Sequence, residues 1–207
     1  MRKGTDDGDR HAAAIIGIYE RHAADFDRER DKRLFERAWL DRFLGRVRAG
    51  GEVVDLGCGS GEPIARAVVE GGWRVTGVDA APAMIALCRK RFPEQSWVVG
   101  DMRGLELGRR FDGVIAFDSF FHLTQQDQRE MFAVFAWLAS GGAPLLFTSG
   151  PRAGVAMGTY HGAPLYHASL DPDAYRGLLD RQGFDIIDFV PEDRDCGGRS
   201  VWLAVKR

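Results

Sequence analysis

The sequence predicts a doubly wound α/β fold with a mostly parallel sheet. From residue 52 onward short apolar runs alternate with helical stretches, and a glycine-rich turn joins the first run to the first helix. Continuous apolar runs are typical of strands that are buried on both faces of a parallel sheet. The last two runs have no room for a helix between them, so these two strands must be antiparallel.

The expected elements follow one another without a linker. The parallel strands are predicted within residues 51–57, 73–79, 96–101, 111–118 and 143–150, and the helices at 63–70, 82–91 and 127–139. Thr124 is a candidate cap for the third of these helices. A fourth helix begins after Asp171 and ends at Gly183. The antiparallel hairpin occupies residues 184–193 and 199–207, which gives a sheet of seven strands.

The N-terminal segment has a different pattern, because it is rich in charge and contains no strand signal. Ile15, Tyr19, His22 and Phe26 are spaced by four, three and four residues, which places them on one face of a helix. A second amphipathic helix is predicted over Leu34–Val47. We expect residues 1–48 to form a helical cap on a single domain of residues 49–207. In this interpretation the first helix is a lid that faces the ligand, although a helix that only packs on the sheet has the same periodicity.

Composition excludes several classes of protein. Of the 207 residues 45% are hydrophobic and 28% are charged, which excludes a disordered or fibrous chain. The net charge of -2 predicts no general attraction to nucleic acid or to an anionic membrane. The three cysteines form no CxxC pair and no histidine pair has metal-ligand spacing, so no metal site is expected. No apolar run is long enough to span a membrane and Met1–Arg10 is polar, which favours the cytoplasm.

The glycine-rich turn is the strongest local signal. It lies in VVDLGCGSGEP, residues 53–63, two residues after Asp55, and it contains Gly57, Cys58, Gly59 and Gly61. Its glycines let the backbone approach a ligand closely at a helix N-terminus. A nicotinamide binder would have glycine where Glu62 stands, and an acidic side chain there would repel a pyrophosphate. The turn therefore favours a ligand with a cationic amino group and no phosphate.

Acidic residues also end the second and third predicted strands. Asp79 can accept both hydroxyls of a ribose, or it could cap the helix that follows. Asp101, between Gly100 and Met102, could contact the edge of an adenine while Met102 covers its face. Open α/β sheets bind ligands at the carboxyl ends of their strands, so these residues are candidates for one site.

These motifs, together with VTGVDAAPAMI and FDGVIAFDSFFHL, resemble those of the class I S-adenosylmethionine-dependent methyltransferases over residues 52–206. The resemblance implies a Rossmann-like fold, S-adenosylmethionine as the cofactor and S-adenosylhomocysteine as its product. It implies that Asp55 holds the methionine amino group and that Asp79 holds the ribose. It places the following residues around the cofactor and the methyl-transfer cavity: Gly57, Cys58, Gly59, Gly61, Ala80, Met84, Gly100, Asp101, Met102, Phe117, Asp118 and Phe120.

A small molecule is the expected methyl acceptor. The segment AFDSFF stands where enzymes that methylate DNA adenine or glutamine have an NPPY-like motif, and no Pro-Cys pair indicates cytosine chemistry. Methyl transfer is an in-line displacement, and a general base helps only an acceptor that arrives protonated. His122, after the fourth strand, is the candidate base, and Tyr19 of the lid is a second candidate catalytic residue.

Other side chains could enclose the acceptor. His161 and His167 lie in the segment that often caps the acceptor pocket in this architecture. Aromatic candidates for its wall are Tyr160, Tyr166 and the pair Phe120-Phe121. Scattered arginines are usually solvated, so we expect no substrate contact from Arg152, Arg194 or Arg199.

Two other functions stay open at this point. A protein that binds S-adenosylmethionine without catalysis would keep the same cofactor residues, whereas a nicotinamide-dependent oxidoreductase is disfavoured by Glu62 and by the antiparallel ending. The sequence leaves open the acceptor atom and the choice between a monomer and a homodimer.

Overall fold

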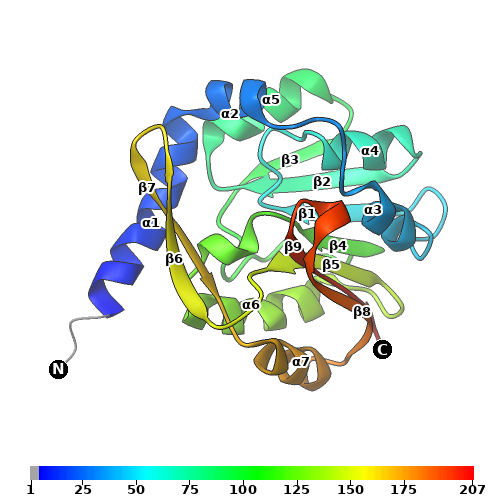
Figure 1. Ribbon diagram of the computed structural model, residues 1–207. Coiled ribbons are helices and arrows are strands. Elements are labelled where there is room, and N and C mark those ends of the chain that lie inside the picture. The colour runs from blue at the N-terminus through cyan, green and yellow to red at the C-terminus, as the bar shows by residue number, and fades with distance from the viewer. Residues whose placement is uncertain (1–4) are drawn as a thin grey trace.

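The computed structural model describes residues 5–207, with side chains from residue 8 onward, and it has the predicted doubly wound α/β fold (Figure 1). The first four residues of the polar segment Met1–Arg10 lie outside the described part. One seven-stranded sheet has the order β3-β2-β1-β4-β5-β9-β8. Its strands are β1 (Glu52–Leu56), β2 (Arg74–Asp79), β3 (Ser96–Val99), β4 (Gly113–Ala116), β5 (Pro144–Ser149), β8 (Phe184–Asp193) and β9 (Arg199–Lys206). The first five are parallel and β9 is antiparallel to both of its neighbours, which confirms the predicted topology.

Helices cover both faces of this sheet. They are α3 (Arg37–Leu44), α4 (Ile64–Glu70) and α5 (Pro82–Arg91) on one face, and α6 (Gln125–Leu138) and α7 (Pro172–Arg181) on the other. Neighbouring residues of β1 point into opposite cores, Val53 toward α3 and α4 and Val54 toward α6 and α7. The predicted cap of α6 is present, since Thr124 Oγ1 accepts the Asp127 backbone N–H at 3.1 Å. No helix in residues 5–207 is both long enough and apolar enough to cross a membrane.

The N-terminal helices divide into two groups. The helix predicted over Leu34–Val47 is shorter, because Leu34 has a left-handed backbone (φ 55°) and α3 starts only at Arg37. Trp39 and Phe43 of α3 are buried in the core of the sheet domain. By contrast, α1 (Thr5–Arg21) and α2 (Ala23–Glu29) contribute no described side chain to the two large cores. The helices α1 and α2, called the cap below, thus lie outside the two large cores, whereas α3 packs in one of them.

A second, two-stranded sheet was not predicted. It is an antiparallel hairpin of β6 (Gly154–Tyr160) and β7 (Ala163–Ser169), and Figure 1 shows it lying along α1. Its two-residue loop, His161 and Gly162, has φ of 47° and 79°, as a type I′ turn requires. Tyr166 and Ala168 pack against Ile18 of α1. The exposed strand β6 lacks a clear apolar alternation, so the turn was the only usable signal in the sequence.

Candidate active site

A cleft lies at the carboxyl ends of β1, β2 and β4, and it consists of two adjoining pockets. The strand-end pocket lies by β2 and the segment after β3, and among its lining residues are Asp79, Ala80, Met84, Gly100, Asp101 and Met102. The arginine pocket lies by β1 and β4, and among its lining residues are Asp55, Cys58, Phe117, Phe121, His167, Arg30 and Arg199. Six residues line both pockets: Tyr19, Phe26, Gly57, Gly59, Asp118 and His122.

The glycine turn shapes the floor between the two pockets. Gly57 has φ of 73°, and a Cβ atom there would lie 2.3 Å from Cβ of Ser119, so a side chain cannot be accommodated. Gly59 has φ of 54° and faces the ring of Phe26. The turn thus presents bare backbone to the cleft, and Phe26 of α2 closes over it.

Asp79 is held rigidly at the end of β2. Its Oδ1 accepts the backbone N–H of Ala81 and its Oδ2 accepts that of Gly59, both at 2.9 Å. Burial raises the pKa of the Asp79 carboxyl, and these two hydrogen bonds act in the opposite direction. Ala81, and not Asp79, is the cap residue of α5. The Asp79 carboxylate joins the glycine turn to the start of this helix and also lines the strand-end pocket.

Asp55 is a buried carboxyl group of the cleft whose pKa is raised. Its side chain is buried, with a residue exposure of 4%, at the bottom of the arginine pocket. Burial, and to a smaller extent the charge of Asp79, raises the pKa of Asp55 to about 7, with no hydrogen bond from the described residues to oppose the shift. A buried carboxylate without a partner is costly, so this site favours a ligand that brings a cation or N–H donors to it.

Asp101 has a partner that the sequence analysis missed. Arg103 donates from Nε to Oδ1 and Oδ2, both at 3.0 Å, and from Nη2 to Oδ2 at 2.6 Å. This guanidinium holds the pKa of Asp101 below its usual range, although burial acts in the opposite direction. Arg103 also lines the strand-end pocket, so a ligand amino group that approaches Asp101 must share the carboxylate with it.

Tyr19 and His122 form a hydrogen-bonded pair that spans the two pockets. His122 Nδ1 lies 2.8 Å from the carbonyl oxygen of Tyr166, which can only accept, so the proton of the neutral ring is on Nδ1. Nε2 is then the acceptor for the Tyr19 hydroxyl at 3.0 Å. Burial lowers the pKa of His122 to about 4 and raises the pKa of Tyr19. At neutral pH both side chains are therefore uncharged, and Nε2 is the basic atom.

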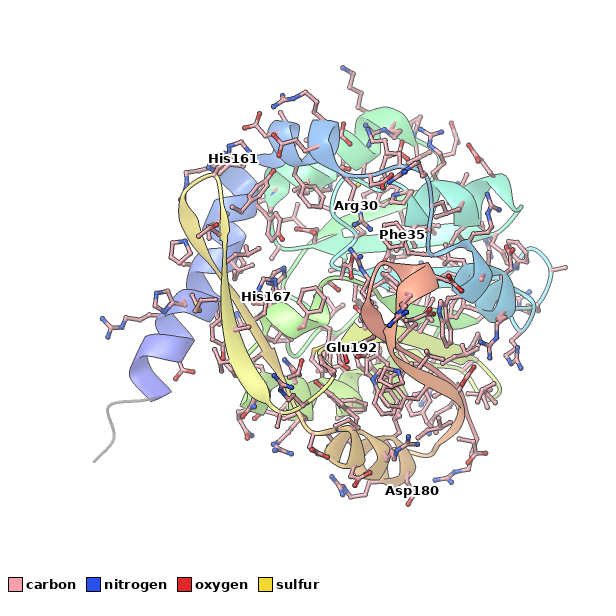
Figure 2. All side chains as sticks on the ribbon, in the orientation of Figure 1. Arg30, Phe35, His161, His167, Asp180 and Glu192 are labelled. Atoms are coloured by element: carbon pink, nitrogen blue, oxygen red, sulfur yellow. The ribbon has the colours of Figure 1, made fainter. Side chains whose placement is uncertain are left out.

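Charged side chains form the wall of the arginine pocket. Asp118, which has φ of 49° just after β4, accepts from Arg199 Nη2 at 2.8 Å and from Arg30 Nη1 at 3.3 Å. Arg30 also donates to the fully buried Glu36 at 2.7 Å. Phe35 packs against both guanidinium groups, with its ring centre 4.4 Å from Cζ of Arg199 and 5.6 Å from Cζ of Arg30. Figure 2 labels Phe35 next to Arg30.

Some sequence expectations need correction here. Arg199 is not a solvated surface arginine: it lies on β9, lines the arginine pocket and donates to Asp118. Arg152 and Arg194 are exposed, as expected. Phe120 does not face the cleft: it is fully buried among Phe132, Phe135 and Phe147.

Gly61, Tyr160 and Tyr166 also differ from the expectation. Gly61 faces Cys88 and Phe92 of the α5 region instead of either pocket. Tyr160 and Tyr166 line neither pocket; Tyr166 contributes only its carbonyl, through His122. The surroundings of Gly61 and of the two tyrosine side chains depend on packing, which the spacing of motifs does not show.

Comparison with known proteins agrees with this geometry. Residues 53–142 match the sequence profile of a family described as "Methyltransferase domain". The trans-aconitate 2-methyltransferase of Escherichia coli (strain K12 / DH10B) is 37% identical over 67 residues, which are 31% of this chain and only 26% of that enzyme. The chain thus matches about a quarter of the length of this curated relative.

Solved methyltransferases share the fold over most of their length. Magnesium protoporphyrin IX methyltransferase from Synechocystis PCC 6803, with bound S-adenosylmethionine, aligns at a TM-score of 0.71 and 18% identity, over 95% of this chain and 97% of that one. A glycopeptide N-methyltransferase in complex with S-adenosylhomocysteine aligns at 0.66 and 22% identity, over 82% and 89%. An amino pentose methyltransferase from Micromonospora echinaspora aligns at 0.69 and 19% identity, over 90% and 96%.

Fold and sequence profile together define a class I methyltransferase architecture. Residues 53–142 carry the methyltransferase-domain profile, and the chain shares its fold with solved S-adenosylmethionine-dependent methyltransferases.

Proposed function

We propose that the protein transfers a methyl group from S-adenosylmethionine to a small-molecule acceptor by in-line displacement. The observation that carries the proposal is the arrangement of three carboxylates, Asp55, Asp79 and Asp101, around a glycine turn in one cleft. Asp55 supports the fit to this cofactor. It is a buried carboxylate without a hydrogen-bond partner among the described residues, and the ammonium group of the cofactor would supply that partner. S-adenosylmethionine supplies an electrophilic methyl group when it is bound.

Each side of the cleft suits one part of that cofactor. We assign the adenosine to the strand-end pocket, where Asp79 would accept the ribose hydroxyls and Met84 and Met102 would flank the base. Asp101 would receive the adenine amino group. The methionine end would lie over Gly57 and Gly59 and reach Asp55, at the junction with the arginine pocket. The arginine pocket is then the place for the acceptor.

The Tyr19–His122 pair is suited to remove a proton from the acceptor. His122 Nε2 can take the Tyr19 hydroxyl proton as Tyr19 takes a proton from a neighbouring nucleophile, so neither residue needs to be charged before the reaction. The Tyr166 carbonyl fixes the ring orientation throughout. Water is limited on this side because Tyr19 and Phe26, with ring centres 5.3 Å apart, cover the cleft.

Replacing Asp79 tests the cofactor assignment. Asp79→Ala is expected to weaken S-adenosylhomocysteine binding by about 1–3 kcal/mol, since a charged hydrogen-bond partner is lost. The fold should persist, because Asp79 borders a pocket and its loss removes only two hydrogen bonds, to the backbone N–H groups of Gly59 and Ala81. Titration calorimetry measures the change, with Asp41→Asn on the exposed face of α3 as the control. Unchanged affinity in a folded variant would remove Asp79 from the site.

Replacing His122 tests the proton-transfer pair. His122→Asn is expected to lower kcat by roughly 100-fold or more for an acceptor that arrives protonated, which is the usual contribution of a general base. Affinity for S-adenosylhomocysteine should change little, because Asp55 and Asp79 are intact. Steady-state kinetics and calorimetry separate the two effects, and His11→Asn, outside both pockets, is the control. A normal kcat would show that the acceptor needs no base from His122.

The acceptor itself requires a screen. Release of S-adenosylhomocysteine should be followed while a metabolite library is offered to the purified chain. Binding of S-adenosylhomocysteine without binding of NADH supports the proposal over an oxidoreductase, and turnover with any acceptor excludes a non-catalytic binding protein. Failure to bind S-adenosylhomocysteine would overturn the proposal.

A further inference from the structure

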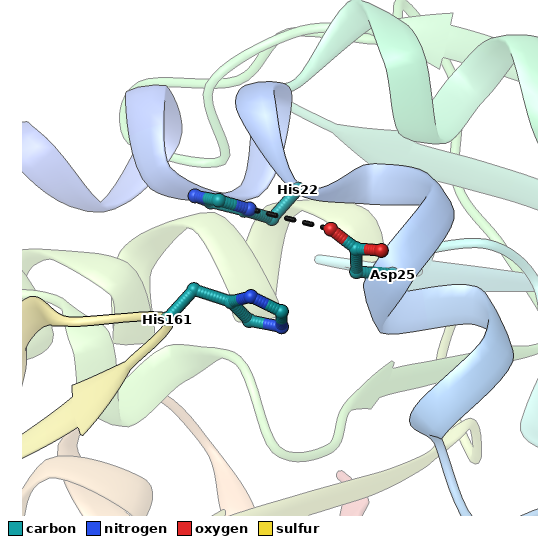
Figure 3. A group of neighbouring side chains, drawn as sticks. All are labelled: His22, Asp25 and His161. Atoms are coloured by element: carbon teal, nitrogen blue, oxygen red, sulfur yellow. Dashed lines mark hydrogen bonds and ion pairs between the residues drawn. The ribbon is translucent and has the colours of Figure 1, made fainter.

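A cluster of metal-ligand side chains lies outside both pockets of the cleft. It joins His22, at the junction of α1 and α2, Asp25 on α2 and His161 at the tip of the β6–β7 hairpin (Figure 3). One ligand atom from each of the three residues lies within 4.8 Å of the others. The His22 Nδ1 to Asp25 Oδ2 distance is already 3.5 Å.

The donor set identifies the kind of ion. Two imidazoles and one carboxylate suit Zn²⁺ and related transition metals, whereas Mg²⁺ and Ca²⁺ prefer oxygen ligands alone. With metal–nitrogen bonds of about 2.0–2.1 Å, tetrahedral ligand atoms lie about 3.3 Å apart. The His22–Asp25 pair has nearly this spacing, and side-chain rotation of His161 at the exposed hairpin tip can bring in the third ligand.

Glu29 lies at the edge of the cluster, next to His161. Its Oε2 lies 3.2 Å from His161 Nε2, again near the spacing of ligands in a tetrahedral site. Arg28 now neutralises the acids, with Nη2 2.6 Å from Asp25 Oδ1 and 3.5 Å from Glu29 Oε1. Its side chain is 65% exposed, so it can turn into solvent when a cation takes its place.

The surrounding packing already holds the two histidines together. Their rings are stacked, with centres 4.7 Å apart and an interplanar angle of 22°. Tyr160 packs edge-on against both rings, at 6.0 Å from His22 and 4.6 Å from His161. The backbone of the cap and the two-residue hairpin turn therefore bring both imidazoles close together before any ion arrives, so binding requires only a rotation of the His161 side chain.

We propose that His22, Asp25 and His161, with Glu29 as a further ligand, bind one divalent transition-metal ion of the Zn²⁺ type. The ion fastens the α1–α2 cap to the tip of the β6–β7 hairpin. The site is distinct from the methyl-transfer cleft and takes no part in the chemistry there. It rests on the geometry of the cluster and not on the proposed methyl transfer.

The direct test is metal binding to the full-length, untagged protein after chelation. Zn²⁺ is titrated in competition with a chromogenic chelator, and one ion per chain is expected. His22→Ala and His161→Ala should each weaken binding by roughly tenfold or more. His11→Ala, at a histidine of α1 that lies outside the cluster, is the matched control and should bind as the unmodified chain does.

Two further readouts separate this site from adventitious binding. Co²⁺ should give a spectrum of nitrogen and oxygen ligands without thiolate charge transfer, which excludes the three buried cysteines as the site. Zn²⁺ should slow amide hydrogen exchange in residues 19–29 and 158–164 of the unmodified chain but not of the His22→Ala/His161→Ala double variant. Thermal melts establish that the variants are folded. Equal Zn²⁺ affinity in the double variant and the unmodified chain, or no binding to the unmodified chain, would overturn the proposal.

Discussion

Asp55→Asn is expected to stabilise the ligand-free protein at pH 8 and, in the same molecule, to weaken binding of S-adenosylhomocysteine. Burial raises the pKa of Asp55 from 3.8 to about 7, so the ionised carboxylate is destabilising in the absence of a ligand. That difference in pKa corresponds to about 4 kcal/mol. The neutral Asn amide of the variant avoids part of this destabilisation. We therefore expect the free energy of unfolding of the variant to be about 1–3 kcal/mol higher than that of the unmodified protein.

The pH dependence of this gain has a definite sign. A carboxyl whose folded-state pKa is raised binds more protons in the folded than in the unfolded chain between pH 4 and about 7, so its contribution to stability falls as the pH rises through that interval. The unfolding free energies of Asp55→Asn and the unmodified protein should therefore be similar near pH 4 and diverge up to pH 8. Chemical denaturation at several pH values measures the difference, with Asp41→Asn as the surface control. A difference that does not grow with pH would contradict the buried, partnerless state of Asp55.

The binding half of the prediction uses the same variant. An ammonium group that approaches Asp55 meets a carboxylate in the unmodified chain but only a neutral amide in the variant. Truncating one partner of a buried charge pair costs about 2–5 kcal/mol of binding free energy. The Asn amide can still form a hydrogen bond to the ammonium group, so we expect a loss of affinity near the lower end of that range. Calorimetry with S-adenosylhomocysteine measures it. Undiminished affinity would mean that the methionine end of the cofactor lies elsewhere.

Removal of residues 1–29 is expected to leave a cooperatively folded domain with much weaker cofactor binding. The two large cores of the sheet domain contain no described residue of α1 or α2. Removal of these two helices therefore takes no packing away from those cores. Tyr19 and Phe26, however, line both pockets. Burying one such aromatic side chain stabilises a complex by about 1.5–3 kcal/mol. Loss of both side chains should therefore weaken S-adenosylhomocysteine binding by roughly 100-fold or more.

The end point of this truncation matters. Arg30 must stay, because it is an ion-pair partner of Glu36, and a buried carboxylate without its partner would destabilise the domain itself. The double variant Tyr19→Ala/Phe26→Ala tests the same idea in the full-length chain, and Arg21→Ala on the exposed side of α1 is its control. A truncated chain that does not fold, or that binds S-adenosylhomocysteine normally, would show that these helices are packing elements and not a lid.

Local sequence was sufficient for the sheet and its order of elements. Strands that are buried on both faces are recognisable as apolar runs, and the short connection between residues 193 and 199 allows only antiparallel pairing. For the same reason the sequence placed Asp55, Asp79 and Asp101 at strand ends, which the structure brings to one cleft. The sequence could not show that Asp55 lacks a hydrogen-bond partner or that Arg103 forms an ion pair with Asp101.

What the sequence by itself determined is therefore the parallel sheet, its glycine turn and the acids at the carboxyl ends of its first three strands, since these depend on residues that are near one another in the chain. Only the tertiary structure decided which side chains meet across long separations. The hydrogen bond of Tyr19 to His122, the pairing of Arg30 and Arg199 on Asp118, and the contact of His22 with His161 all join distant segments. The burial that lowers the pKa of His122 and raises that of Asp55 is likewise a property of the packed interior. Periodicity records which face of an element is apolar, but the partner of each side chain depends on how complete elements pack together.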